Sequence, residues 1–137
     1  MNRLLGTISA IESNGHLSLV DVVAGRDVFT AMLLETPESA PHLRVGNRVA
    51  VLFKETEVSL AKDLSGRISL RNRIPCTVRG IREGDILCEV SLDRDGQPLS
   101  SIVTTRAVRR LELRAGDTVE ALVKANEVSI AEAGDEP

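Results

Sequence analysis

Residues 118–131 read TVEALVKANEVSIA, and residues 48–61 read RVAVLFKETEVSLA, so the second half of the chain repeats the first at an offset of 70. The same offset holds without a gap over most of the sequence. It matches Asn2-Arg3 with Asn72-Arg73, Thr7 with Thr77, Ile11 with Ile81, Leu17 with Leu87, Val20 with Val90, Leu43-Arg44 with Leu113-Arg114 and Gly46 with Gly116. A constant offset of this kind indicates two copies of one small module.

The apolar pattern within the second copy predicts short strands. From Ile86 on, Ile86, Cys88, Val90 and Leu92 fall on one face and Glu89 and Ser91 on the other, which is typical of a half-buried strand. Asp93-Arg94-Asp95-Gly96 predicts a hairpin turn into a returning strand over 99–104. Strands are also expected over 73–81, 118–124 and 127–131. Thr105 is a suitable cap for a short helix with Val108 and Leu111 inward and Arg106, Arg109 and Arg110 outward.

Five short strands with one helical turn between the third and fourth predict an OB-like barrel. The fold class is therefore expected to be all-β, with two tandem OB-like five-stranded barrels that each carry one short helix, near 36–41 and 105–111. The predicted boundaries are a divergent first module at 1–62, a linker at 63–68, a second module at 69–131 and a disordered tail at 132–137. The linker is too short to let the modules move far apart.

Composition excludes several classes of protein. The chain is 42% hydrophobic, with Phe29 and Phe53 as its aromatic residues, so the cores must be aliphatic. A net charge of −3 argues against broad nucleic-acid binding. The sequence has neither an apolar run long enough to span a membrane nor a signal peptide pattern, so we expect a cytoplasmic protein. Cys76 and Cys88 lie in the second copy alone, and two buried, reduced thiols are favoured over a disulfide.

Two motifs in the second copy resemble those of a known family. The stretch Ile68-Ser69-Leu70-Arg71-Asn72-Arg73 is similar to the Ser-Ala-Arg-Asn opening of the molybdate-binding Mop module, also called molbindin or TOBE domain. Cys88-Glu89-Val90 matches its Ala-Glu-Val strand, and Lys124-Ala125-Asn126-Glu127-Val128 matches its Lys-Ala-Ser/Thr-Glu-Val ending. The tandem arrangement resembles the di-Mop proteins.

This resemblance implies a protein that binds a tetrahedral oxyanion, molybdate or tungstate, through hydrogen bonds and without direct metal coordination. It implies storage or homeostasis of the oxyanion in the cytoplasm, sites between modules, a homotrimer of six modules and no catalytic residues. The alternative is a molybdate-sensing accessory module that acts on a separate transporter or transcription factor. The sequence does not distinguish molybdate from tungstate, or storage from sensing.

A molybdate dianion offers four acceptor oxygens, so its site needs converging hydrogen-bond donors and positive charge. Candidate donors in the second copy occupy the matched motifs and the junction between strand and helix. They are Ser69, Leu70, Arg71, Thr104, Lys124 and Ala125, with Leu70, Arg71 and Ala125 contributing backbone N–H groups. Thr104 is equally suited to a role as a helix cap. Weaker candidates are Lys54, Thr36 and Ser39.

The first copy departs from the motif at several of these positions. Met1 stands where the second copy has Arg71, and Leu34 replaces Thr104. Lys54 is retained, but the Glu55 carboxylate beside it would repel a dianion. We therefore expect the two copies to provide unequal sites, with binding mainly on the second.

Two other functional classes compete with oxyanion binding. An OB-type interaction or nucleic-acid module would make the donors incidental, but the acidic charge and the scarcity of aromatic residues argue against it. An enzyme is disfavoured because His16 and His42 have no counterparts in the second copy (Ile86 and Glu112), and no carboxylate pair is placed for acid–base chemistry.

Overall fold

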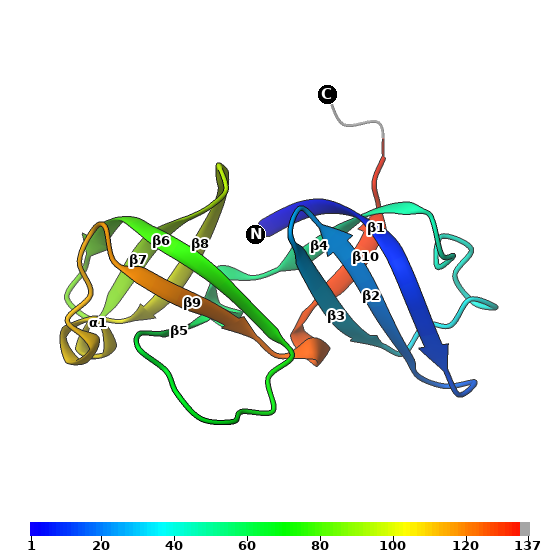
Figure 1. Cartoon of the computed structure of the whole chain (residues 1–137), viewed down its shortest axis with the longest axis horizontal. Helices are drawn as coiled ribbons and strands as arrows, with labels where there is room; N and C mark the ends of the chain where they lie inside the picture. The colour runs from blue at the N-terminus through cyan, green and yellow to red at the C-terminus, as the bar shows by residue number, and fades with distance from the viewer. Residues whose placement is uncertain (135–137) are drawn as a thin grey trace. The chain divides into compact units, whose positions relative to one another are not determined.

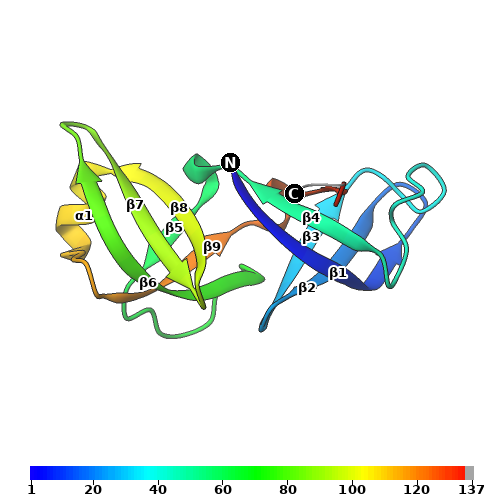
Figure 2. The ribbon, with the colours of Figure 1, turned by 90° about the horizontal axis from the view of Figure 1, so that it is seen from above.

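The computed structural model describes residues 1–134, which form two curled five-stranded sheets (Figure 1 and, seen from above, Figure 2). The first contains β1, β2, β3, β4 and β10, and the second contains β5 to β9. The elements are β1 Asn2–Ser13, β2 Ser18–Ala24, β3 Asp27–Leu33, β4 Arg48–Phe53, the 3₁₀ turn η1 Glu55–Glu57, β5 Ser59–Ala61, β6 Asn72–Glu83, β7 Leu87–Arg94, β8 Gln97–Thr104, the helix α1 Thr105–Leu111, β9 Thr118–Val123, the 3₁₀ turn η2 Ala125–Glu127 and β10 Ser129–Glu132. The predicted fold class of tandem OB-like barrels is confirmed.

The 70-residue offset of the sequence reappears in the strand pairing. Asn2 pairs with Phe53 where β1 meets β4, and Asn72 pairs with Val123 where β6 meets β9. Both long strands also shift register at matching places, between Ile8 and Ala10 in β1 and between Val78 and Gly80 in β6. The two sheets are thus built to one plan, strand by strand.

The last strand of each barrel comes from the other copy of the repeat. β10 pairs antiparallel with β4, and β5 pairs antiparallel with β9. In Figure 1, β10, at the red end of the colour scale, lies beside β4 among the strands of the first copy. The compact units are consequently residues 1–53 with 124–137, and the contiguous segment 54–123.

The predicted boundaries 1–62 and 69–131 therefore describe the sequence repeat and not the compact units. The physical reason is that β5 and β10 are nearly identical, in the contexts Glu57-Val-Ser-Leu-Ala61 and Glu127-Val-Ser-Ile-Ala131. Either strand can fill the edge of either sheet, and period-2 patterning does not specify which copy it joins. Residues 63–68, the predicted linker, lie in an irregular segment within the second unit.

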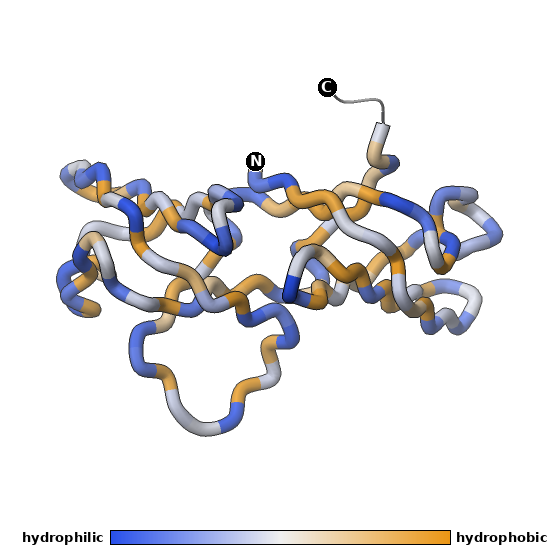
Figure 3. Tube along the Cα trace, turned by 45° about the horizontal axis from the view of Figure 1, so that its top comes forward, coloured by the Kyte–Doolittle hydropathy of each residue, from blue (hydrophilic) through white to orange (hydrophobic). Residues whose placement is uncertain are grey.

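Both barrels have aliphatic cores, as the composition predicts. The largest fully buried side chains are Phe29, Phe53, Ile8, Leu43, Val20, Val22, Val49 and Val51 in the first unit, and Leu92, Val78, Val90 and Val123 in the second. Phe29 and Phe53 stack with ring centroids 6.0 Å apart. Figure 3 colours the chain by hydropathy, and buried and less buried positions alternate along much of β1, β6 and β7, as expected where one face of a sheet is buried. Cys76 and Cys88 are buried free thiols, which confirms that prediction.

The helix prediction is correct for one copy and wrong for the other. α1 covers Thr105–Leu111, as expected. Residues 36–41 form only a turn, in which the carbonyl of Thr36 accepts from the N–H groups of Ser39 and Ala40. Pro41 follows Ala40 directly. Because proline cannot donate a backbone hydrogen bond and disfavours helical geometry in the residue before it, the turn does not continue into a helix.

Two further expectations need correction. Ile86, predicted to point inward, is 76% exposed because β7 begins only at Leu87 and Ile86 belongs to the preceding turn. The predicted disordered tail begins too early, since Glu132 is the last residue of β10 and pairs with Val49. Residues 133 and 134 follow the strand, and 135–137 lie outside the described residues.

Candidate functional site

The candidate cation Lys124 lies where β9 ends and η2 begins. Its backbone is extended (φ −69°, ψ 143°), and its side chain is exposed. In η2 the carbonyl of Lys124 accepts from the N–H of Glu127 at 2.9 Å, and the carbonyl of Ala125 accepts from Val128 at 3.3 Å. Both of these bonds use carbonyl groups. The N–H groups of Lys124 and Ala125 donate in neither bond, and they have no acceptor within residues 1–134. An ammonium and two free N–H groups together form a donor set suited to an anion.

The equivalent turn of the first copy differs in its electrostatics. The N–H of Lys54 donates to the Oε1 of Glu57 at 3.0 Å, so a carboxylate occupies the donor that stays free at Lys124. Glu55 adds a second acid where the second copy has Ala125. Lys54 thus lies among carboxylates, which would repel a dianion.

Ser69, Leu70 and Arg71 form the irregular lead-in to β6. The Ser69 and Arg71 side chains are exposed, and neither forms a hydrogen bond or ion pair within the described part of the chain. Asn72 follows directly and is only 1% exposed. Its side-chain amide donates to the carbonyl of Val123 at 3.1 Å and so ties the lead-in to the end of β9.

Sequence reasoning did not select Asn72 as a candidate. The signal that could have found it is its match with Asn2 in the first copy, which is likewise buried at 5% exposure. A buried amide needs hydrogen-bond partners, and an asparagine retained at matching positions of both copies is therefore consistent with a fixed structural contact.

Thr104 ends β8 and is the N-cap of α1. Its Oγ1 accepts from the backbone N–H of Ala107 at 3.1 Å, which confirms the helix-cap interpretation. The hydroxyl proton is not used by that bond and remains a donor for a further acceptor.

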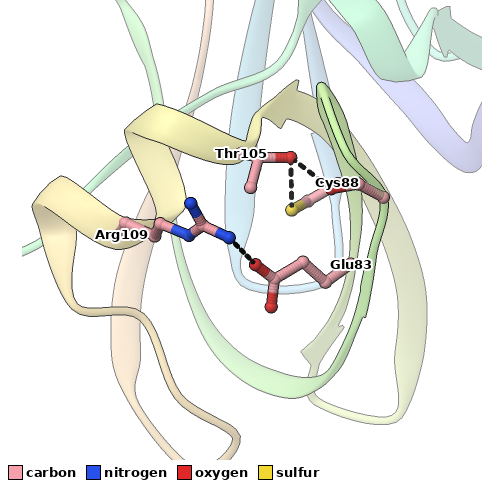
Figure 4. Close-up of polar contacts among 5 residues, drawn as sticks. Glu83, Cys88, Thr105 and Arg109 are labelled. Atoms are coloured by element: carbon pink, nitrogen blue, oxygen red, sulfur yellow. Dashed lines mark hydrogen bonds and ion pairs between the residues drawn. The ribbon is translucent and has the colours of Figure 1, made fainter.

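The start of α1 is fixed to the β6–β7 turn by the contacts drawn in Figure 4. Thr105 donates from Oγ1 to the carbonyl of Gly84 at 2.7 Å, and the Cys88 thiol donates to the same Oγ1 at 3.4 Å. Arg109 Nη2 lies 3.1 Å from Glu83 Oε1. These contacts hold the helix start, and with it Thr104, in one position on the barrel.

We expect Thr104→Ala to lower the free energy of unfolding by about 1 kcal/mol, because the mutation leaves the Ala107 N–H without its cap. Thr104→Asn should retain most of that stability, since asparagine is an equally good N-cap. Urea denaturation of the two variants measures the difference. Equal stability of Thr104→Ala and the wild type would contradict the cap role.

The weaker candidates Thr36 and Ser39 close the turn of the first copy. The N–H of Thr36 donates to Ser39 Oγ at 2.9 Å, and that hydroxyl donates to the carbonyl of Thr36 at 3.2 Å. Thr36 is buried at 6% exposure. These contacts give Ser39 a structural role that needs no ligand.

The candidates do not all belong to one unit. Lys124 and Ala125 belong to the first unit, and Ser69 to Arg71, Thr104 and Lys54 to the second. Within the second unit, β6 starts after Arg71 and ends at Glu83, and Thr104 is level with Leu87 beyond that far end. The lead-in and Thr104 of one barrel are therefore at opposite ends of β6.

Two carboxylates in the second unit are stabilised in their charged form. Arg73 binds Glu120 through two hydrogen bonds, of 3.0 and 2.8 Å, and these lower the pKa of Glu120 below its usual 4.5. The backbone N–H of Arg114 and the Lys62 ammonium lower the pKa of Asp117. The contact of Glu120 stabilises β9, and those of Asp117 stabilise the loop before it.

A lowered folded-state pKa means that the Glu120 contact contributes stability above the unfolded pKa and loses it as pH falls through the folded pKa. We therefore expect Glu120→Gln to be less stable than the wild type near neutral pH and to lose less stability on acidification. Urea midpoints from about pH 7 to about pH 3 test this. Parallel pH profiles for the two proteins would contradict it.

Among residues 1–134, no group of three or more His, Cys, Asp or Glu side chains could hold a metal ion. No helix in this part of the chain is long and apolar enough to cross a membrane.

Comparison with known proteins places the chain in a family. A TOBE domain model matches residues 68–130. The "Molybdenum transport protein ModE" of Herbaspirillum seropedicae is 31% identical over 133 residues, 95% of this chain and 49% of that protein. The "Molybdenum-pterin-binding protein MopB" of Rhodobacter capsulatus is 36% identical over 94 residues, 63% of this chain and 35% of that protein. The chain thus spans about half or less of these curated relatives.

A solved structure matches over the whole fold. The crystal structure of "the cytoplasmic molybdate-binding protein ModG", in a form with molybdate bound, has a TM-score of 0.90 and 34% identity, with 96% of this chain and 95% of that chain covered. That coverage includes both barrels. The chain belongs to the Mop/TOBE (molbindin) family, in its tandem form.

Proposed function

We propose that this protein binds molybdate, or the similar tungstate, as a free oxyanion in the cytoplasm, and that it stores or buffers the anion without catalysis. The observation that carries the proposal is the likeness over both barrels to a cytoplasmic protein solved with molybdate bound. ModE and MopB, the curated relatives compared above, are likewise named for molybdenum.

The free donors at the end of β9 support a hydrogen-bonded site there. We assign Lys124 and the N–H of Ala125 to the anion, together with Ser69, the N–H groups of Leu70 and Arg71, the Arg71 guanidinium and the Thr104 hydroxyl. Because these groups belong to different units, or to opposite ends of one barrel, the site is expected to combine donors from more than one module. Charge-assisted donors of this kind bind an oxyanion without metal coordination.

Self-association follows from the same argument, and the resemblance to the di-Mop proteins points to a homotrimer. A site that draws donors from several modules needs modules held side by side, and each barrel alone has a small core. We expect the protein in solution to have three times the 14.8 kDa mass of the chain. Light scattering at micromolar concentration measures this, and a monomeric mass would contradict the trimer.

Metal analysis after loading tests the function directly. The protein is incubated with molybdate, desalted and analysed for bound molybdenum, with sulfate and phosphate as competitors. We expect retained molybdenum that excess sulfate or phosphate fails to displace. Release by equal concentrations of sulfate would show general anion binding and contradict the proposal.

A further inference from the structure

An exposed apolar tip with a basic flank lies at one end of the second unit. Ile86 is 76% exposed and Leu87 54% exposed. The tip is fixed to the helix, since the carbonyl of Ile86 accepts from the N–H of Thr105 at 2.8 Å. Arg106 and Arg110 are exposed on α1, four residues apart and so on one face, and neither has an acidic partner among residues 1–134.

The first unit carries a concave apolar surface with a negative instead of a positive charge beside it. A largely apolar hollow of about 250 Å³ is lined by Glu12, Ser13, Asn14, Leu17, Leu19 and Met32. Leu19 and Met32 are cross-strand neighbours and are each 40% exposed. Glu12 lies in the wall of the hollow, and the exposed Glu35 lies two residues after the end of β3. The hollow is therefore largely apolar, with the Glu12 carboxylate in its wall.

Most of these residues are not required by the barrel, because the twin barrel has different residues at the matching positions; the exception is Leu87, which matches Leu17. The positions of Ile86, Arg106 and Arg110 are occupied in the first copy by His16, Thr36 and Ala40. The positions of Leu19 and Glu12 are occupied in the second copy by Glu89 and Arg82. Exposed apolar surface that the fold does not need marks an interaction site.

We propose that the tip of the second unit, Ile86 and Leu87 flanked by Arg106 and Arg110, docks into the hollow of the first unit of another copy of this chain. The two surfaces are complementary in both polarity and charge, and both are present in equal number on every copy. A contact between two different surfaces is head-to-tail, and it closes into a ring when the rotation allows. The inference rests on the proposed self-association and identifies the surfaces that would mediate it. The contact does not depend on oxyanion binding.

Two variants, one on the tip and one away from both surfaces, provide the test. Ile86→Asp should weaken self-association at least about tenfold, because it places a charge in an apolar contact beside acidic residues. Val45→Asp, the same kind of change at a 63% exposed apolar residue of the first unit that belongs to neither surface, should leave association unchanged. Both are followed by sedimentation over a concentration series, with circular dichroism as the check on folding.

Charge reversal gives a second, independent readout. Arg106→Glu/Arg110→Glu and Glu12→Arg should each weaken association alone, and a single protein that carries all three changes should associate again, because every tip then meets a hollow of opposite charge. Failure of this combined variant to associate, or an Ile86→Asp protein that keeps the wild-type mass, would overturn this contact while leaving the trimer intact. A monomeric wild type would overturn both, and molybdenum retention reports separately on anion binding.

Discussion

Removal of residues 129–137 is expected to unfold the barrel that contains the N-terminus and to leave the second barrel folded. The truncation deletes β10, whose residues Ser129 to Glu132 pair with Leu52 to Val49 of β4. It also removes Ile130, which is only 7% exposed in the core. Losing this side chain and one edge of the sheet should cost the first unit at least about 3 kcal/mol.

Hydrogen exchange resolved by residue measures this result. Amide protection should fall in β1 to β4 and persist in β6 to β9. A matched pair of point variants provides the control, because Val128 and Val58 occupy equivalent positions and are 2% and 3% exposed. Val128→Ala should weaken the first unit and Val58→Ala the second, by roughly 1–3 kcal/mol each. Loss of protection in β6 to β9 on truncation would contradict the strand exchange.

Lys124→Ala is expected to weaken molybdate binding by about ten- to a hundredfold. It removes a charge-assisted hydrogen bond to a dianion, which contributes roughly 1.5–3 kcal/mol. Arg71→Ala should have a similar effect through the loss of its guanidinium. Lys54→Ala should change affinity much less, because the Glu57 carboxylate already occupies the Lys54 N–H and Glu55 lies beside it.

Isothermal titration calorimetry on the three variants compares these affinities. Lys124→Arg, which keeps a positive charge, controls for the loss of charge alone. Equal losses of molybdate affinity for Lys54→Ala and Lys124→Ala would show that both copies bind the anion and would contradict the prediction of unequal sites. Unchanged binding in all three variants would place the site elsewhere on the molecule.

Much of the architecture could be predicted because it rests on local rules. Alternation of Cys88, Val90 and Leu92 defines a half-buried strand in any environment, and all three are buried. The two-residue turn at Asp95 and Gly96 has positive φ at both positions, as hairpins with such sequences require. α1 also lies where its apolar spacing predicts, although its N-cap is Thr104 and not Thr105, which is the first helical residue. The failed helix at 36–41 was equally local, since Pro41 was visible in the sequence.

For the site, the sequence by itself determined which donors are available and that the two copies differ. Lys124 and Lys54 were found through their shared position at the end of a strand, and Glu55 already distinguished them. The fold added two contacts that the spacing of residues in the sequence does not reveal. The Glu57 carboxylate accepts from the Lys54 N–H, and the buried Asn72 amide donates to a carbonyl at the end of β9. Such contacts depend on where side chains meet in space.

The barrel that each edge strand joins depends on the three-dimensional path of the chain. β5 and β10 carry almost the same residues, so hydrophobic pattern, propensity and burial favour either assignment equally. The exchange, with β5 on β9 and β10 on β4, depends on the path that the chain takes after Phe53 and Val123. The sequence repeat therefore predicts the strand order of each barrel. Which residues build each barrel depends on the long-range path of the chain, because near-identical strands compete for the same sheet edges.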